Sequence, residues 1–131
     1  MARVLGIGGV FFHSRDPKAL QAWYHEHLGF PACEGDHPSV VFKFDEDIAA
    51  GRQGYAVWGP FPESTSYFEP SNKTFMVNFR VDDLDGMLAD LRQKGIDIVD
   101  GPKDEAPYGR FAWIVDPEGT KIELWEPPLA T

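Results

Sequence analysis

The sequence has a single cysteine, Cys33, which excludes an internal disulfide and a cysteine-rich zinc site. It also lacks an apolar stretch long enough to cross a bilayer. The opening run MARVLGIGGVFF is short, carries one arginine and has no cleavage-like ending. We therefore expect a cytoplasmic protein with no membrane partner.

Basic residues are scarce. The chain has 12 Lys and Arg against 21 Asp and Glu, a formal net charge of -9, which disfavours nucleic acids and anionic membrane surfaces as partners. Neutral or cationic small molecules remain compatible with this charge. The length of 131 residues fits one domain, 1–131, with a sizeable core.

Common catalytic motifs are missing too. Gly6, Gly8 and Gly9 cluster near the start, but their spacing differs from a dinucleotide-binding loop and strand-like residues follow them. The sequence contains no H-E-x-x-H zinc motif, no phosphate-binding loop and no G-x-S-x-G elbow. The chemistry therefore has to be sought in the pattern of the predicted strands.

The clearest local pattern is a hairpin within PYGRFAWIVDPEGTKIELWEP, residues 107–127. It predicts two strands, FAWIVD and TKIELWE, joined by a turn in which proline presets one dihedral angle and Gly119 supplies a positive one. Ile122 and Leu124 point to one face of the second strand, and Lys121, Glu123 and Trp125 point to the other. Glu123 therefore lies on a face that borders water, a metal or a ligand.

Upstream of the hairpin, the chain shows one theme twice. A strand-like run leads to an aspartate that caps a helix, with proline following in the first copy, and a glycine ends the helix. Phe12 and Phe79, Asp16 and Asp83, and Leu20 and Met87 are each separated by 67 positions. This constant offset predicts two βαβββ modules in one domain.

The modules can be delimited approximately. Module 1 spans about 1–60, a proline-rich connector about 61–73, and module 2 about 74–128. The predicted strands of module 1 are 4–14, 30–34, 39–44 and 54–59, and those of module 2 are a strand ending at 81, a strand at 96–99 and the hairpin. The connector carries Tyr67 and Phe68, which we expect to be exposed and to act as an interface or a lid.

Sorting the strand residues by alternation separates two faces. We expect Val10, Phe12, Val77, Phe79 and Val81 to face the helices. The other face combines large aromatic groups with a few polar groups, which is typical of a small-molecule pocket. From it we predict a ligand-binding set of eight residues: Phe11, His13, Trp58, Asn78, Arg80, Trp113, Glu123 and Trp125. The alternative is that these side chains pack the centre of a curved sheet, with Arg80 and Glu123 neutralising each other.

Three stretches together resemble the vicinal oxygen chelate superfamily, which includes glyoxalase I, bleomycin-resistance proteins, fosfomycin-resistance enzymes and extradiol dioxygenases. They are FFHSRDPKALQAWYHEHLGF, FRVDDLDGMLADLRQKGI and GRFAWIVDPEGTKIELWEP. The resemblance implies an α+β fold in which two βαβββ modules form a curled, cup-like, eight-stranded mixed sheet. It also implies a homodimer.

Enzymes of this superfamily hold one divalent metal in the cup through side chains of four strands. The resemblance places these positions at Gly9, Trp58, Met76 and Glu123. Glycine has no side chain, indole offers no lone pair and a thioether is a poor ligand for zinc, manganese or iron. A single carboxylate does not make a stable divalent site, so we predict no metal site and no cofactor, with a divalent metal as the alternative.

Three hypotheses follow. The first is a metal-free protein that binds a planar or cationic small molecule through its tryptophans and Glu123. The second is a lyase, isomerase or dioxygenase, with an unusual metal site or with Glu123 as catalytic base and Arg80 or His13 as its electrophilic partner. The third is an interaction module whose cup is filled by its own side chains.

Overall fold

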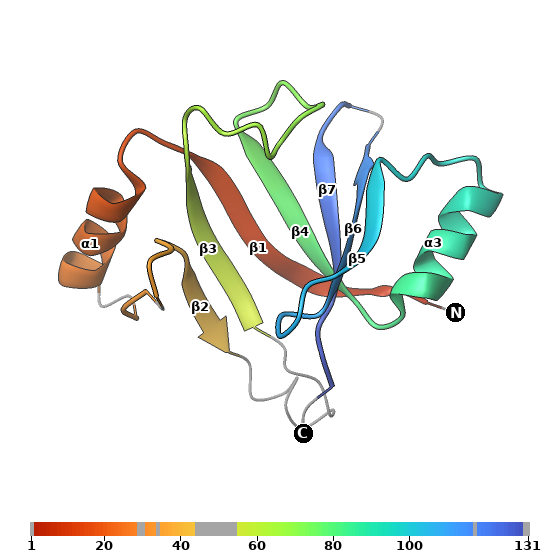
Figure 1. The fold of residues 1–131 in the computed structure, drawn as a ribbon, viewed down its shortest axis with the longest axis horizontal. Coiled ribbons are helices and arrows are strands. Elements are labelled where there is room, and N and C mark those ends of the chain that lie inside the picture. Colours follow the sequence, from red (N-terminus) through yellow and green to blue (C-terminus); the bar gives the residue numbers. More distant parts are fainter. Residues whose placement is uncertain (1, 29–30, 34, 44–54, 117, 130–131) are drawn as a thin grey trace.

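The computed structural model describes residues 2–28, 31–33, 35–43, 55–116 and 118–129. The protein is an α+β domain, and in these residues two helices flank an open, curved, mixed sheet (Figure 1). Its elements in chain order are β1 (Val4–Ser14), α1 (Pro17–Leu28), β2 (Val40–Lys43), β3 (Tyr55–Pro62), β4 (Phe75–Val81), α3 (Leu84–Gln93), β5 (Asp100–Asp104), β6 (Arg110–Val115) and β7 (Lys121–Glu126).

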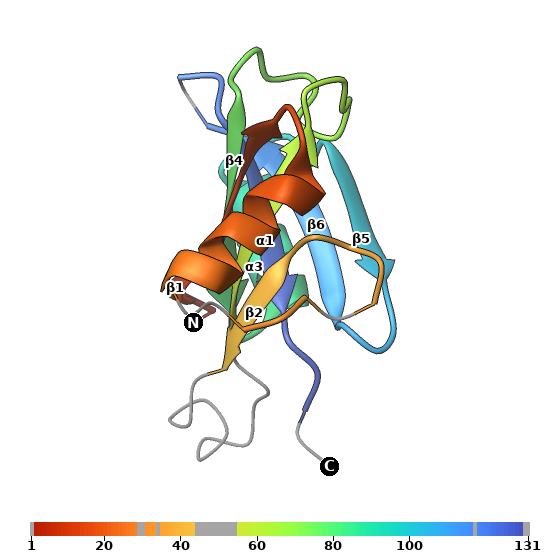
Figure 2. The same ribbon diagram turned by 90° about the vertical axis from the view of Figure 1, so that its left-hand side faces the viewer.

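The sheet has the order β2-β3-β1-β4-β7-β6-β5, so β1 and β4 form its centre. These two strands run antiparallel, and Val10 lies opposite Val77. The same two residues occupy equivalent positions in the sequence repeat. The early strands β3 and β2 extend the sheet on one side, and β7, β6 and β5 extend it on the other (Figures 1 and 2).

Both helices begin as the sequence predicts. Asp16 Oδ1 accepts a hydrogen bond from the Ala19 N–H at 3.1 Å, and Asp83 Oδ1 accepts one from the Gly86 N–H at 3.0 Å. Each aspartate thereby satisfies a backbone donor that a helix leaves free in its first turn. Gly95, at a φ of 79°, follows the end of α3.

The helices cover opposite ends of the sheet rather than its centre (Figure 1). Helix α3 packs through Leu84 and Leu88 against a core that includes Val81, Ile114 and Leu124. Helix α1 lies beside β3. Val10, which we expected under a helix, is 51 % exposed, because the central strands β1 and β4 lie between the helices. The side chains of 23, 24 and 26–28 lie outside the described residues.

Two predicted strands differ from the observed ones. Of the strand predicted at 30–34, residues 30 and 34 lie outside the described residues and 31–33 are not in a strand, so the described part of the chain has seven strands where eight were expected. The strand predicted at 96–99 is also wrong, because Ile98 packs toward the α3 core and pairing with β6 begins at Asp100. No helix in the described part of the chain is long and apolar enough to cross a membrane.

The predicted hairpin is confirmed as β6 and β7, with Trp113 opposite Glu123. Asp116 organises its turn, since Oδ1 of this residue accepts hydrogen bonds from the N–H groups of Glu118 and Thr120, both at 2.9 Å. Gly119 has the positive φ, 83°, that the turn requires. The register of this hairpin fixes which residues of β7 face the inside of the curved sheet.

Candidate functional site

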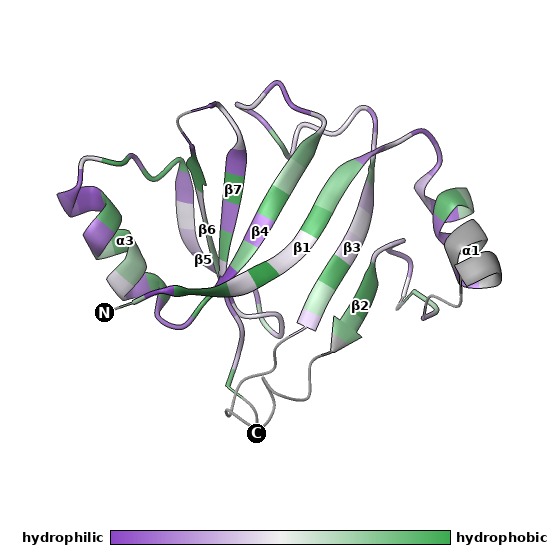
Figure 3. Cartoon of the chain, turned by 180° about the vertical axis from the view of Figure 1, so that it is seen from behind, coloured by the Kyte–Doolittle hydropathy of each residue, from purple (hydrophilic) through white to green (hydrophobic). Residues whose placement is uncertain are grey.

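The concave face of the sheet collects most of the predicted site residues. The register places Phe11 opposite Met76, Asn78 beside Glu123 and Trp125 opposite Phe111. Hydrophilic and hydrophobic residues alternate along β7, so that Glu123 lies on this face and Ile122 and Leu124 on the other (Figure 3). We call the space bounded by this face the cup.

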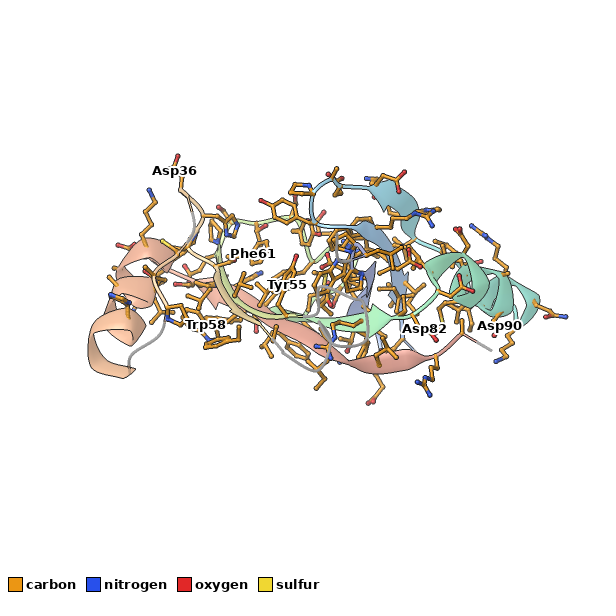
Figure 4. All side chains as sticks on the ribbon, turned by 90° about the horizontal axis from the view of Figure 1, so that it is seen from below. Asp36, Tyr55, Trp58, Phe61, Asp82 and Asp90 are labelled. Carbon is orange, nitrogen blue, oxygen red and sulfur yellow. The ribbon has the colours of Figure 1, made fainter. Side chains whose placement is uncertain are left out.

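Trp58 is not in the cup, and our prediction for its face was wrong. Val57 and Phe61 of the same strand pack into the cluster of the cup, whereas the Trp58 ring packs against Phe12, with centroids 5.2 Å apart. Figure 4 shows Trp58 on the opposite side of the sheet from Tyr55 and Phe61. The run Gly54–Gly59 is apolar on both faces, so its alternation gave no means of choosing between them.

Glu123 is the polar centre of the cup and is only 3 % exposed. One carboxylate oxygen, Oε1, accepts a hydrogen bond from Asn78 Nδ2 at 2.7 Å. The other, Oε2, accepts one from Trp113 Nε1 at 2.9 Å and one from the Tyr67 hydroxyl at 2.5 Å. Three neutral donors from three different segments thus hold one buried carboxylate.

The two polar residues expected beside Glu123 have other neighbours. Arg80 Nη1 donates to the carbonyl oxygen of Ile7 at 3.3 Å. The His13 ring stacks on Phe68, with centroids 5.0 Å apart and an interplanar angle of 20°. Neither residue is among the hydrogen-bond donors to Glu123, so the structure does not place them as its electrophilic partners.

The segment between β3 and β4, residues 63–74, enters the cup. Phe68 is 2 % exposed and belongs to the same cluster as Phe11, Met76 and Trp113. Its ring also lies 5.3 Å from that of Phe61. The prediction that Phe68 is exposed was therefore wrong: this side chain fills part of the cup instead of presenting a surface.

Tyr67 lies beside Phe68 and reaches Glu123. Its ring stacks on Phe61 at 5.4 Å and meets Trp113 edge-on at 6.3 Å. Burial, and then the adjacent Glu123 carboxylate, raises the pKa of the Tyr67 phenol well above its usual range. The hydroxyl therefore stays protonated and keeps donating to Glu123 at neutral pH.

Beside Tyr67 the cup opens to solvent through a cleft of about 600 Å³. Its walls carry four aromatic residues and two lysines: Tyr67, Tyr108, Phe111, Trp113, Lys103 and Lys121. The rings of Phe111 and Trp113 are nearly parallel, with an interplanar angle of 15°. Such a surface suits a flat ligand. Glu123 is beneath Tyr67 and Trp113 and does not line the cleft itself.

The two lysines of the cleft differ in their partners. Lys103 forms an ion pair with Asp100 at 2.8 Å. Lys121 is 9 % exposed and donates to the main-chain oxygen of Tyr67 at 2.5 Å, and within the described residues no carboxylate forms an ion pair with it. Burial lowers the pKa of the Lys121 ammonium, and the nearby Glu123 carboxylate opposes this shift.

The four positions that the family uses for a metal can now be placed. Gly9 and Met76 lie on the cup face with Glu123, while Trp58 points away from it. A Cβ atom at Gly9 would lie 2.5 Å from the carbonyl oxygen of Val57, so the backbone leaves no room for a side chain there. The described residues contain no group of three or more His, Cys, Asp or Glu side chains that could hold a metal ion.

Sequence reasoning missed the roles of Tyr67 and Phe61 in this site. Phe61 was missed because the predicted strand ends at 59 and leaves this residue in the connector, whereas β3 continues to Pro62 and carries Phe61 on the cup face. The only signal for Tyr67 in the sequence was its aromatic side chain beside Phe68 in the proline-rich connector, from which we expected an interface or a lid. The contact between Tyr67 and Glu123 joins residues 56 positions apart, which no local pattern encodes.

Comparisons with known proteins agree with this architecture. Residues 6–124 match the family model described as the Glyoxalase/Bleomycin resistance protein/Dioxygenase superfamily. No relative was found among the curated proteins.

Similar solved structures include a methylmalonyl-CoA epimerase from Streptomyces coelicolor, with 18% identity, a TM-score of 0.69 and coverage of 98% of this chain and 100% of that one. The methylmalonyl-CoA epimerase from Mycobacterium tuberculosis has 23% identity, a TM-score of 0.61 and coverage of 95% and 89%. A superfamily member from Vibrio splendidus 12B01 has 14% identity, a TM-score of 0.57 and coverage of 96% and 99%. At these identities the likeness establishes the fold.

Proposed function

Because the chain belongs to the glyoxalase/bleomycin resistance protein/dioxygenase superfamily, we propose that it binds a small planar molecule in its cup without a resident divalent metal. The observation that carries this proposal is the open cleft walled by Tyr67, Phe111 and Trp113, with Glu123 buried beneath it. Flat aromatic walls with a few convergent polar groups are the usual composition of a small-molecule site.

The residues at the family's metal-ligand positions support the metal-free part of the proposal. Of the side chains at Gly9, Met76 and Glu123, only the carboxylate is a suitable ligand for a hard or borderline cation. Its two oxygens are engaged by Asn78, Trp113 and Tyr67.

The epimerases among the structural neighbours raise the alternative of catalysis by Glu123. A general base has to reach the proton that it removes, directly or through one water molecule. Glu123 lies under Tyr67 and Trp113, so a substrate would meet it only after Tyr67 leaves. Both oxygens of Glu123 already accept hydrogen bonds from Asn78, Trp113 and Tyr67, which is the role of a recognition group, and we therefore favour a binding function.

Tryptophan fluorescence tests the proposal, and the chain supplies its own control. We expect planar molecules to change the emission of the wild type and the response to be lost in Trp113→Phe, because the Trp113 ring forms a wall of the cleft. Trp58→Phe should retain the response, since Trp58 is on the opposite face of the sheet.

The same titration is repeated after exhaustive dialysis against a chelator, with the metal content of the purified protein measured beforehand. Unchanged affinity is the expected result. No response from a broad panel of planar acids, bases and neutral compounds would rule against binding. Near-stoichiometric zinc, iron, manganese or nickel would rule against the metal-free assignment.

We also propose that the protein forms a homodimer through the outer face of β1 and β4. Ile7, Val10 and Phe75 on these strands are 59 %, 51 % and 39 % exposed. The inter-strand pairs on this face are Val10 with Val77, Phe12 with Phe75 and Ile7 with Phe79. None of these residues is charged, so a second copy can pair with the same face without like-charge repulsion despite the net charge of -9.

Val10→Glu should convert the dimer into a monomer, since it introduces a negative charge at the middle of this face in both copies. Light scattering coupled to size exclusion measures the mass of each variant. Val99→Glu is the matched control because Val99 is similarly exposed, at 43 %, and precedes β5 at the far edge of the sheet. A monomeric wild type, or a Val10→Glu variant that remains dimeric, would contradict this interface.

A further inference from the structure

Tyr67 makes the contacts of a bound ligand rather than those of a loop residue. Its ring lies between the face of Phe61 and the edge of Trp113. Its hydroxyl donates to Glu123 Oε2, and its main-chain oxygen accepts from Lys121 Nζ. The aromatic ring contacts strands β3 and β6, and the hydroxyl at one end and the oxygen at the other are both bound by β7, through Glu123 and Lys121.

Glu123 sets the first requirement for any molecule that replaces Tyr67. When the Tyr67 hydroxyl leaves, Oε2 of this buried carboxylate loses one of its two donors. Loss of a hydrogen bond to a buried charged group is costly, so a good ligand has to supply a donor at the same point. A phenolic hydroxyl on a flat ring does so and keeps the contact with Phe61.

Lys121 sets the second requirement. Its ammonium lies 5.0 Å from the centre of the Tyr67 ring and 5.8 Å from that of Trp113. In the described part of the chain its hydrogen-bond acceptor is the neutral carbonyl of Tyr67, and it forms no ion pair. The ammonium is already a charged donor, and a carboxylate in place of that carbonyl adds the opposite charge on the acceptor, so the hydrogen bond becomes an ion pair.

We propose that Tyr67 occupies the ligand subsite in the free protein and that the ligand is a planar phenol with a carboxylate at the end opposite its hydroxyl. This inference rests on the proposed function and specifies its ligand class. The ligand displaces Tyr67, its hydroxyl donates to Glu123 and its carboxylate binds Lys121.

A simple probe copies the covalent skeleton of the residue that it replaces. In 3-(4-hydroxyphenyl)propanoate the ring, two carbons and carboxyl carbon follow one another as the ring, Cβ, Cα and carbonyl carbon do in tyrosine. Its methyl ester removes the charge at one end, and 3-phenylpropanoate removes the hydroxyl at the other. The three compounds therefore test the contacts with Lys121 and Glu123 separately.

Tyr67→Ala vacates the subsite. We expect this variant to bind the probe at least about tenfold more tightly than the wild type, which has to displace its own side chain first. The ester, which loses the negative charge that pairs with Lys121, and the deoxy analogue, which loses the hydrogen bond to Glu123, should each bind to Tyr67→Ala at least about tenfold more weakly than the acid. Lys121→Met should abolish the preference for the acid over the ester.

Tryptophan fluorescence and thermal stabilisation both measure these affinities. Phe42→Ala is the matched control, because Phe42 is an aromatic residue of nearly the same exposure, 36 % against 38 % for Tyr67, and lies opposite Ala56 on the face of the sheet that carries Trp58. It should leave the affinity of the probe unchanged. If Tyr67→Ala does not fold, Tyr67→Phe and the wild type support the same comparison among the three compounds.

The outcomes separate this inference from the proposed function. Equal affinity for acid, ester and deoxy analogue would overturn the ligand class while leaving binding in the cup intact. The ligand class would also be overturned, with binding in the cup intact, if other planar compounds bind to the wild type while the probe binds neither to the wild type nor to Tyr67→Ala. If no compound binds to the wild type or to Tyr67→Ala, both proposals fail.

Discussion

Phe68→Ala is expected to lower the free energy of unfolding by about 3–5 kcal/mol, the range measured for large aromatic side chains removed from protein cores. Phe68 is 2 % exposed and packs against His13 and Phe61. The substitution removes the ring that joins the segment 63–74 to the cluster of Phe11, Met76 and Trp113. Urea unfolding followed by circular dichroism measures the change in free energy.

Tyr108→Ala provides the reference for that experiment. It also removes an aromatic ring near the cleft, but Tyr108 is 61 % exposed, so the loss should stay within about 0.5 kcal/mol. A loss of less than about 1 kcal/mol for Phe68→Ala would contradict the packing described above. It would show that Phe68 contributes little to the folded state and that the segment 63–74 leaves the cup at small cost.

The sequence predicts those elements of the fold that local chemistry specifies. The bounds of β1 follow from its β-branched and aromatic residues, and the starts of α1 and α3 follow from the capping residues Asp16 and Asp83. The β6–β7 hairpin follows from alternation and from the positive φ of Gly119. In each case a few neighbouring residues hold the information.

The failures have a common origin in long-range packing. Trp58 was assigned to the wrong face because its strand is apolar on both sides, and an error of one residue in alternation moves every side chain across the sheet. Val10 was placed under a helix because the repeat predicts a helix for each module without predicting which strands it covers. Neither property is encoded within a few residues.

The candidate site was predicted only in part, because some of its residues are placed by local alternation and others by long-range packing. Alternation on β4, β6 and β7 brought Asn78, Trp113 and Glu123 to one face, and the structure joins all three by hydrogen bonds. The third donor, Tyr67, comes from a segment with no regular structure whose position depends on the finished cup. Together with Trp113 it covers Glu123, which is 3 % exposed.

That burial makes Glu123→Ala the second substitution with a large expected effect. It leaves the Asn78 amide, the Trp113 indole and the Tyr67 hydroxyl without their acceptor. Each unsatisfied buried donor costs about 1–3 kcal/mol, partly offset by the removal of a buried charge and by water entering the vacated space. We expect a net loss of about 3–5 kcal/mol in the free energy of unfolding, measured by urea titration.

Two further variants decide what the loss means. Glu123→Gln keeps the volume of the side chain and one acceptor oxygen, but its amide nitrogen cannot accept the hydrogen bonds that the second carboxylate oxygen accepts. The free energy of unfolding should therefore fall by about half as much as in Glu123→Ala. Glu105→Ala, an exposed carboxylate at the cleft, should change the free energy by less than about 0.5 kcal/mol. If Glu123→Ala were as stable as the wild type or more so, the three hydrogen bonds would not offset the desolvation of the carboxylate. Glu123 would then reduce stability in the free protein, as expected of a group whose full set of partners is completed by a ligand.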